Sequence, residues 1–452
     1  MTADVIVVGG GAAGLTTAVD LARAGRRVTV LDAATRVGGC LAPVRPDGLP
    51  DGVLLDGGAE SFATRTTAVV ELLADVGLAD DVVLPRRLGA WVQHAGGPVA
   101  LPAAGLLGIP VQPWAPDVIR AIGLAGSARA SLDRLLPARV GLRPGPMSVA
   151  ELVSSRMGRR VLDRLVTPIV GGVHSSTPHA LDADTALAGV RDGIRETGSL
   201  AAAVARIRER SPAGAAAAGL RGGLHRVPPV LEQDVSRHGG QVRTGARVEA
   251  LSRRPDGRWE VHLGAEVLLA DDVVVATTGT GAARLLEPWA HVQVPPAVPV
   301  TIVTLVLDAP DLEAAPRGTG VLVSPDAGVA AKGLTHATAK WEWLARATPG
   351  RQVVRLSYGR GGSRPDPGLD TALTDASVLL GVPVTRTMVR GWARTEWPVG
   401  LGAPAAGHRD RMAALRAGVP RGLWVTGAWV SGTGLASVVA DARATAAAIT
   451  RE

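Results

Sequence analysis

The sequence predicts an α/β fold, because a strand, a glycine-rich turn and a helix open the chain and similar segments alternate after them. Val5–Val8 form a continuous β-branched run, which is typical of a strand buried on both faces. A second such run, 27–31, follows the first helical segment. The chain has 452 residues, of which 46% are apolar and 20% charged. At about 150 residues per domain, this composition predicts a globular protein of two or three domains.

The turn after the first strand has the spacing of a dinucleotide-binding loop. Gly9, Gly11 and Gly14 occupy the glycine positions of G-x-G-x-x-G. They permit the tight turn, the approach of a pyrophosphate and close helix packing, respectively. A helix over 15–24 would place its positive N-terminus at that pyrophosphate. Asp32, which ends the second strand about 20 residues later, is placed to bind the ribose hydroxyls. The sequence therefore predicts a Rossmann-type domain, with a glycine-rich turn lacking a ligand as the alternative; Ala12, Ala13 and Ala33 complete this part of the predicted cofactor site.

The residues after Asp32 select the cofactor. Arg36-Val37-Gly38-Gly39 resembles the FAD-binding signature of the amine-oxidase-like flavoproteins. Gly38 and Gly39 would let the chain pass the flavin end, and Arg36 would approach the phosphates. Cys40 is interpreted as a small apolar filler rather than a covalent flavin attachment. As the only cysteine, it excludes a disulfide framework and an all-cysteine metal site. No metal is predicted, and a reducing compartment, the cytoplasm, is expected.

The rest of the chain returns to the cofactor domain twice. We assign 1–78, 220–295 and 385–452 to a discontinuous FAD-binding domain, which includes Val248 as a cofactor contact. Residues 79–95 and 296–384 are assigned to a mixed-sheet substrate domain, with strands at Val300–Leu307 and Arg351–Tyr358. Residues 96–219 are assigned to a mostly helical insertion, in which Ser148 and Glu151 have the spacing of a capping box.

The charge of the chain is dominated by arginine. Of the 48 cationic side chains only Lys332 and Lys340 are lysines, and the net charge is +7. The excess fits either the codon bias of a GC-rich genome or an acidic partner. Basic runs interleaved with aromatics are missing, which argues against nucleic acid. We predict neither a signal peptide nor a transmembrane helix. Residues 98–122, with Trp114, are read as a peripheral membrane contact or a buried helical hairpin.

Four blocks together resemble the oxygen-dependent porphyrinogen oxidases, the protoporphyrinogen and coproporphyrinogen III oxidase family. The resemblance covers nearly the whole chain and is strongest to the soluble actinobacterial coproporphyrinogen III oxidases. The blocks are Gly58–Phe62, Leu165–His174, His336–Trp341 and Thr426–Leu435. The chain departs from the family at Pro398-Val399-Gly400, where a Pro-Gln-Tyr is usual, and at His174, which replaces an aromatic residue.

The resemblance implies FAD as cofactor and a site at the junction of the domains. It adds to the cofactor-binding set Gly58, Ala59, Glu60, Ser61, Thr277, Gly279, Trp392, Gly427, Gly434, Leu435 and Ala436. It points to the Gly172 backbone near the carbon that is oxidised. Trp392 and Trp397 are expected at the domain junction, with stacking on the substrate as the alternative.

Three side chains are candidates for substrate binding. Arg65 is assigned to a propionate because guanidinium groups bind carboxylates in a bidentate manner, with a solvated surface arginine as the alternative. His174 is expected to face the pocket or to be a satisfied core histidine. Lys340 is expected to bind a propionate or to extend to the surface.

The implied reaction is oxidation of coproporphyrinogen III by dioxygen, with release of hydrogen peroxide, in haem synthesis. No obligatory acid–base residue is needed, because the cofactor provides the chemistry. Protoporphyrinogen IX is the alternative substrate. A flavin amine oxidase is the nearest rival, although one tyrosine and one phenylalanine make an aromatic amine cage hard to build. A carotenoid desaturase and a flavin-binding protein without turnover are the other rivals. Transient contact with ferrochelatase is left open.

Overall fold

A seven-stranded sheet contains the predicted dinucleotide-binding unit. The computed structural model describes residues 2–64, 66–102, 105–174, 176–209, 217–294, 298–360, 366–398 and 405–452. The sheet has the order β12-β2-β1-β15-β14-β13, with β21 paired to β15. Strands β12, β2, β1, β15 and β21 are parallel, whereas β13, β14 and β15 form an antiparallel meander. Their bounds are β1 Thr2–Val8, β2 Val28–Leu31, β12 Gln241–Arg243, β13 Ala250–Arg253, β14 Trp259–Leu263, β15 Glu266–Val275 and β21 Leu423–Val425.

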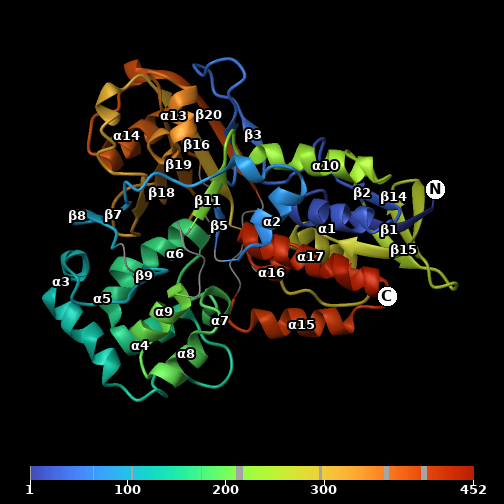
Figure 1. The fold of residues 1–452 in the computed structure, drawn as a ribbon, viewed down its shortest axis with the longest axis horizontal. Helices are drawn as coiled ribbons and strands as arrows, with labels where there is room; N and C mark the ends of the chain where they lie inside the picture. The colour runs from blue at the N-terminus through green and yellow to red at the C-terminus, as the bar shows by residue number, and fades with distance from the viewer. Residues whose placement is uncertain are drawn as a thin grey trace.

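Both faces of this sheet are covered, as the β-branched run in β1 predicts. Val5 and Val7 belong to one apolar cluster, with residues of four helices, whereas Ile6 and Val8 belong to a second cluster on the other face. The helices of the first face are α1 Ala12–Arg23, α2 Ala68–Asp75, α10 Val227–Arg237 and α17 Leu435–Arg451; those of the second are α11 Gly279–Leu286, α15 His408–Gly418 and α16 Ala428–Ser431. Helices α1 and α17 lie side by side, and both chain termini lie at this end of the molecule (Figure 1).

A second seven-stranded sheet has the order β20-β16-β19-β18-β17-β7-β8. Only the β7–β17 pair is parallel, so the sheet is mixed, as predicted. Its strands are β7 Trp91–His94, β8 Gly97–Ala100, β16 Val300–Leu307, β17 Gly320–Val323, β18 Gly333–His336, β19 Gln352–Tyr358 and β20 Val389–Trp397. Helix α14, Leu369–Leu380, packs its leucines against one face. Short helices α12, Ala337–Lys340, and α13, Glu342–Ala347, connect β18 to β19.

Strand pairing places two sequence boundaries differently from the predicted division of the chain. The predicted boundary between 95 and 96 falls inside the β7–β8 hairpin, because Trp91 to His94 pair with Gly97 to Ala100. Strand β20 lies within the predicted cofactor segment 385–452, yet it pairs along its whole length with β16 of the second sheet. The β7–β8 hairpin is a local pairing, whereas the β16–β20 pairing is long-range and leaves no local signal in the sequence.

Residues 105–209 contain the predicted helical insertion, seen at the lower left of Figure 1. Its helices are α3 Pro116–Ser131, α4 Val149–Met157, α5 Arg159–Val161, the π-helical turn η3 Leu162–Val166, α6 Thr167–His174, α7 Ala183–Ala186, α8 Val190–Thr197 and α9 Leu200–Glu209. Helix α4 begins with the predicted capping box, in which Ser148 and Glu151 bond each other's backbone N–H. Arg156 and Asp133 are completely buried and ion-paired here, and Arg156 also donates to the carbonyls of Val140 and Gly198.

Small elements complete the described part of the chain. They are the strands β3 Pro43–Val44, β4 Leu55–Asp56, β5 Phe62–Ala63, β6 Val82–Val83, β9 Gly105–Leu106, β10 Ile109–Pro110 and β11 Ala217–Leu220, and the 3₁₀ turns η1 Ala79–Asp81, η2 Leu132–Arg134, η4 Leu224–Arg226, η5 Pro310–Leu312 and η6 Arg386–Met388. Within the described ranges no helix is long and apolar enough to span a membrane.

Candidate functional site

The glycine-rich turn forms a cradle between β1 and α1. Gly9 has a φ of +108°, and a Cβ there would lie 2.7 Å from the Ala276 carbonyl oxygen. A Cβ on Gly14 would lie 1.8 Å from the Gly9 carbonyl oxygen. Gly11 differs, because a Cβ there would meet nothing within 4 Å. The first two glycines therefore serve close packing of the protein itself, whereas the space in front of Gly11 is open, as a site for a pyrophosphate requires.

Asp32 holds this turn from the end of β2. Its carboxylate accepts hydrogen bonds from the backbone N–H groups of Gly10, at 2.7 Å, and Ala34, at 2.7 Å. The Gly38 N–H donates to the Gly10 carbonyl at 2.7 Å, which places the Arg36–Gly39 segment across the turn. Arg36 donates to the carbonyls of Val37 and Gly39. The acid and the Arg-x-Gly-Gly segment therefore meet at one edge of the sheet.

The remaining predicted cofactor residues of the first sheet gather at the same edge. The Ala59 N–H donates to the Cys40 carbonyl, and a Cβ on Gly58 would lie 2.1 Å from that carbonyl oxygen. Thr277 follows β15 and lies beside both Gly9 and Gly427. The Cys40 side chain is exposed, and its interpretation as an apolar filler beside the cofactor stays a prediction. The Val248 carbonyl accepts a hydrogen bond from Arg284. Two residues earlier in the chain, the Ala246 N–H donates to the Asp32 carbonyl. Parallel strands bring these residues together because their carboxyl ends share one edge.

Two helix N-termini face this edge without side-chain caps. Gly11 is the N-cap of α1 and Gly434 is the N-cap of α17, and neither helix has a capping side chain or an acidic residue in its first turn. Leu435 and Ala436 form the start of α17. Uncapped first-turn N–H groups favour negatively charged ligands. The open space at Gly11, the Asp32 carboxylate and these helix ends fit the pyrophosphate and ribose of FAD.

Three charged side chains form a largely buried cluster between the first and second sheets. The Lys340 ammonium lies 2.6 Å from Glu60, and Arg355 of β19 pairs with the other carboxylate oxygen. Arg355 also donates to the Gly58 carbonyl at 2.7 Å. The side chains of Glu60, Lys340 and Arg355 are 14%, 17% and 8% exposed. Two cations and one carboxylate leave the cluster with a formal charge of +1.

The cations fix the ionisation of Glu60. Burial alone would raise the pKa of the Glu60 carboxyl, but the adjacent Lys340 and Arg355 outweigh burial and lower it to about 2. Glu60 is therefore a carboxylate across the physiological pH range. Glu60 was predicted in the cofactor-binding set, and its carboxylate is engaged by these two cations.

The structure shows the surroundings of two of the four predicted substrate residues. Gly172 lies on α6, where a Cβ would come within 2.5 Å of the Leu322 side chain, so this glycine permits close packing of α6 on β17. Lys340 is not at the surface, and its ammonium is paired with Glu60. Arg65 and the side chain of His174 lie outside what the structure describes. The assignments of all four residues to the substrate stay predictions.

The two tryptophans of β20 differ in their contacts and in their exposure to solvent. Trp397 donates from its indole to the Gly57 carbonyl at 3.0 Å, which links the second sheet to the predicted cofactor segment. Trp392 is 40% exposed. Its place in the cofactor-binding set stays a prediction.

Arg355 was not among the predicted site residues, although the sequence around it is unusual for a buried strand. Arg355 is the one charged residue within β19, and its neighbours Val353, Val354 and Leu356 are fully buried. A cation inside a buried strand requires a carboxylate partner. The partner, Glu60, lies 295 residues away in the sequence. In the part of the chain that is described, no group of three His, Cys, Asp or Glu side chains has a metal-binding arrangement.

Comparisons with known proteins agree with this geometry. A family model described as flavin-containing amine oxidoreductase matches residues 12–450. The coproporphyrinogen III oxidase of Mycobacterium tuberculosis is 30% identical over 96% of this chain and 95% of its own. The chloroplastic protoporphyrinogen oxidase 1 of Spinacia oleracea is 25% identical over 99% and 84%. The crystal structure of a "Putative protoporphyrinogen oxidase" from Exiguobacterium superposes with a TM-score of 0.84 at 23% identity, covering 99% of this chain and 98% of that one.

These matches confirm three predictions from the sequence. The predicted family is confirmed by the near full-length similarity to the mycobacterial enzyme. The fold class is confirmed by the superposition with the Exiguobacterium structure. FAD is confirmed as the cofactor by the flavin-containing family model, which begins at Ala12 inside the glycine-rich turn.

Proposed function

Because the chain belongs to the flavin-containing amine oxidoreductase family, we propose that it oxidises coproporphyrinogen III to coproporphyrin III. Dioxygen is the electron acceptor and hydrogen peroxide the second product. The similarity to the mycobacterial coproporphyrinogen III oxidase over 96% of this chain is the observation on which the proposal rests. The open space in front of Gly11 and the Asp32-anchored turn support it.

The reaction balances over three rounds. Conversion of a porphyrinogen to a porphyrin removes six electrons and six protons, so three dioxygen molecules become three hydrogen peroxide molecules. FAD, when bound, supplies the two-electron acceptor for each round. The chain's own residues bind and orient FAD and the substrate. The Gly11 turn and Asp32 would hold the cofactor, and the residues between the two sheets would face the substrate. In this proposal the predicted cofactor-binding residues keep the roles given to them above.

The charge cluster supports an anionic substrate. Coproporphyrinogen carries four propionates, and the cluster formed by Glu60, Lys340 and Arg355 has one cation in excess. A propionate near Lys340 would complete its charge balance. Arg65 is proposed for another propionate, so Arg65→Ala should raise KM with little change in kcat. An unchanged KM contradicts that assignment.

An amine oxidase activity is disfavoured by where the aromatic residues lie. Tyr358 is buried in the core under α14, and Phe62 is buried in the core of the first sheet. They are the only tyrosine and phenylalanine of the chain. Neither is available to cage an amine, which leaves only tryptophans for that role.

Aerobic turnover of two substrates tests the proposal. The purified, FAD-loaded protein is given coproporphyrinogen III or protoporphyrinogen IX, and porphyrin fluorescence is followed against an enzyme-free control. Faster oxidation of coproporphyrinogen supports the proposal. Faster oxidation of protoporphyrinogen keeps the reaction and changes the substrate, whereas turnover of amines alone contradicts both. The proposal places the protein in cytoplasmic haem synthesis, where transient contact with ferrochelatase would be tested separately by co-purification.

A further inference from the structure

A large cavity lies outside the predicted cofactor and substrate residues. Its volume is about 990 Å³. Its walls come from residues 52–54, residues 82–84, the turn 221–226 and helix α13. None of the lining residues belongs to the site assigned above. Small-molecule sites measure about 300–1,000 Å³, so this cavity has room for a large ligand.

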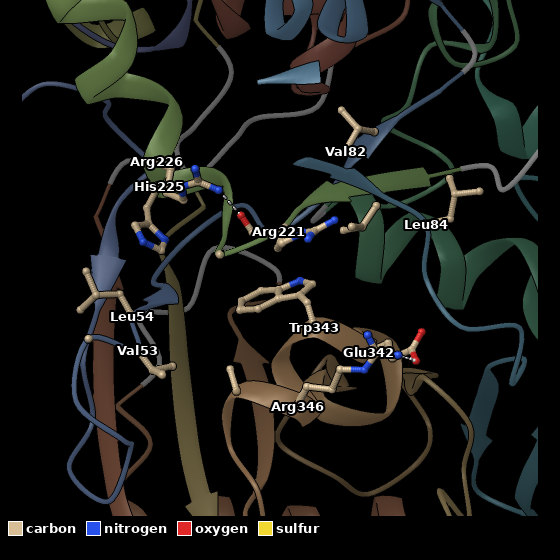
Figure 2. A pocket seen from close by; sticks show the side chains of 14 residues that line it. Val53, Leu54, Val82, Leu84, Arg221, His225, Arg226, Glu342, Trp343 and Arg346 are labelled. Atoms are coloured by element: carbon tan, nitrogen blue, oxygen red, sulfur yellow. Dashed lines mark hydrogen bonds and ion pairs between the residues drawn. The ribbon is translucent and has the colours of Figure 1, made fainter. Parts of the chain in front are cut away.

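The lining combines an aromatic face with guanidinium groups. Trp343 of α13 stands at the centre of the view in Figure 2, between Arg221 on one side and Arg346 on the other. Leu54 and Leu84, which also line the cavity, are exposed apolar side chains. An indole face and exposed leucines favour a flat apolar ligand, and arginines favour carboxylates at its rim.

The arginines have partners that a ligand can replace. Asp81 lies 2.8 Å from Arg226 and 3.8 Å from Arg221, and Glu342 pairs with Arg346. Three guanidinium groups thus share two carboxylates. Arg221 and Arg346 are 61% and 78% exposed. Exposed pairs of this kind contribute about 0–1 kcal/mol, so a ligand carboxylate can take over these arginines at small cost. His225 also lines the cavity, but its ring is buried and paired with Asp56 at 3.0 Å.

We infer that this cavity binds a planar aromatic molecule with carboxylates around its rim. The oxidised porphyrin belongs to this class, whereas a porphyrinogen does not, because its saturated bridging carbons interrupt the conjugation and bend the ring. The cavity is therefore a holding site for the reaction product, an identification that rests on the proposed function. Trp343 also lines a small void, about 20 Å³ in volume, together with Glu60 and Arg355. The cavity thus adjoins the charge cluster without being part of it.

Equilibrium binding of coproporphyrin III to the FAD-loaded, full-length protein tests the inference. The change in porphyrin fluorescence gives Kd. We expect Trp343→Leu to raise Kd at least about tenfold, because it removes the stacking face. Arg346→Gln should raise Kd about two- to fivefold, because it removes an exposed carboxylate partner. Trp114→Leu and Arg195→Gln are matched controls, since both residues are exposed and lie outside the cavity. Butanetetracarboxylate, which has carboxylates but no ring, should not displace the porphyrin.

The outcomes separate this inference from the proposed function. Arg346 is a surface residue, so Arg346→Gln keeps the test valid even when Trp343→Leu does not fold. Unchanged Kd in Arg346→Gln and in folded Trp343→Leu overturns the cavity site, whatever the turnover of the wild type. Displacement by butanetetracarboxylate overturns the aromatic requirement. If binding depends on Trp343 but the protein does not oxidise porphyrinogen, the cavity still binds a planar aromatic carboxylate. The identification of that ligand as the reaction product is then overturned.

Discussion

Replacing Glu60 with glutamine tests the charge cluster between the sheets. The substitution keeps the size of the side chain and removes its charge. Lys340 and Arg355 then stay in place as two cations without a carboxylate, of which Arg355 is buried and Lys340 largely buried. Breaking a buried ion pair in this way costs about 3–5 kcal/mol, because an uncompensated charge is left in a poorly solvated place. We expect Glu60→Gln to lower the free energy of unfolding by this amount at neutral pH.

The pKa of Glu60 gives a second magnitude for the same two contacts. It falls from an ordinary value of 4.5 to about 2. A tenfold change in proton affinity is worth about 1.4 kcal/mol, so the ionised carboxylate stabilises the fold by about 3 kcal/mol. Because the pKa is lower in the folded state, this stabilisation is present above about pH 4.5 and is lost as the pH falls towards 2. The difference between wild type and Glu60→Gln should therefore shrink over that interval.

Urea unfolding of the FAD-loaded proteins provides the assay, at several pH values and at two FAD concentrations. A ligand stabilises the folded state in proportion to the logarithm of its concentration above Kd. With one FAD concentration below Kd and one far above it, a part of the difference that appears only at the higher concentration therefore reports a weaker affinity for FAD when Glu60 is replaced. Glu196→Gln is the matched control, since Glu196 pairs with Arg206 at the surface. A loss for Glu60→Gln no larger than for this control, about 1 kcal/mol or less, would refute the reasoning.

Four further substitutions test the cofactor turn, the buried Arg156–Asp133 pair and the cap of α4. Gly11→Ala should leave the melting temperature of the FAD-free protein unchanged but raise the Kd for FAD at least about tenfold, because its Cβ would enter only the space reserved for the pyrophosphate; titration of flavin fluorescence measures this. Gly14→Ala should lower both stability and FAD content, since its Cβ would strike the Gly9 carbonyl, and an unchanged melting temperature would contradict this. Arg156→Met should cost about 3–5 kcal/mol in urea unfolding, because it leaves the Asp133 carboxylate buried without a cation. Ser148→Ala should cost about 1 kcal/mol by loss of the capping box, and no measurable loss would contradict the cap.

The parts of the fold that depend on local sequence were predictable. The β-branched run of β1, the glycine spacing before α1 and the Ser148–Glu151 box each determine structure within a few residues, and each is present in the structure. Strands β16 and β19 likewise follow from runs that are mostly apolar and rich in β-branched residues. The edge of the first sheet at which the predicted cofactor residues meet was predictable, because the carboxyl ends of its parallel strands converge there.

Features that depend on distant residues were not predictable from local patterns. Glu60 meets Lys340 and Arg355 across 280 and 295 residues. Neither cation has a local feature that identifies its partner, and no spacing rule links β20 to β16. The cavity around Trp343 is built from four separate segments, so its arginines could be counted but not placed. Chain topology, rather than residue type, creates these sites.

The ratio of dioxygen consumed to porphyrin formed tests the central claim most directly. An oxygen electrode and porphyrin absorbance are read together while the FAD-loaded protein oxidises coproporphyrinogen III, with Gly11→Ala as the control for cofactor dependence. We expect three dioxygen molecules to be consumed and three hydrogen peroxide molecules to be released for each porphyrin, and a rate that falls with FAD occupancy in the variant. Porphyrin formation without matching oxygen consumption, or at the same rate without bound FAD, would contradict this expectation.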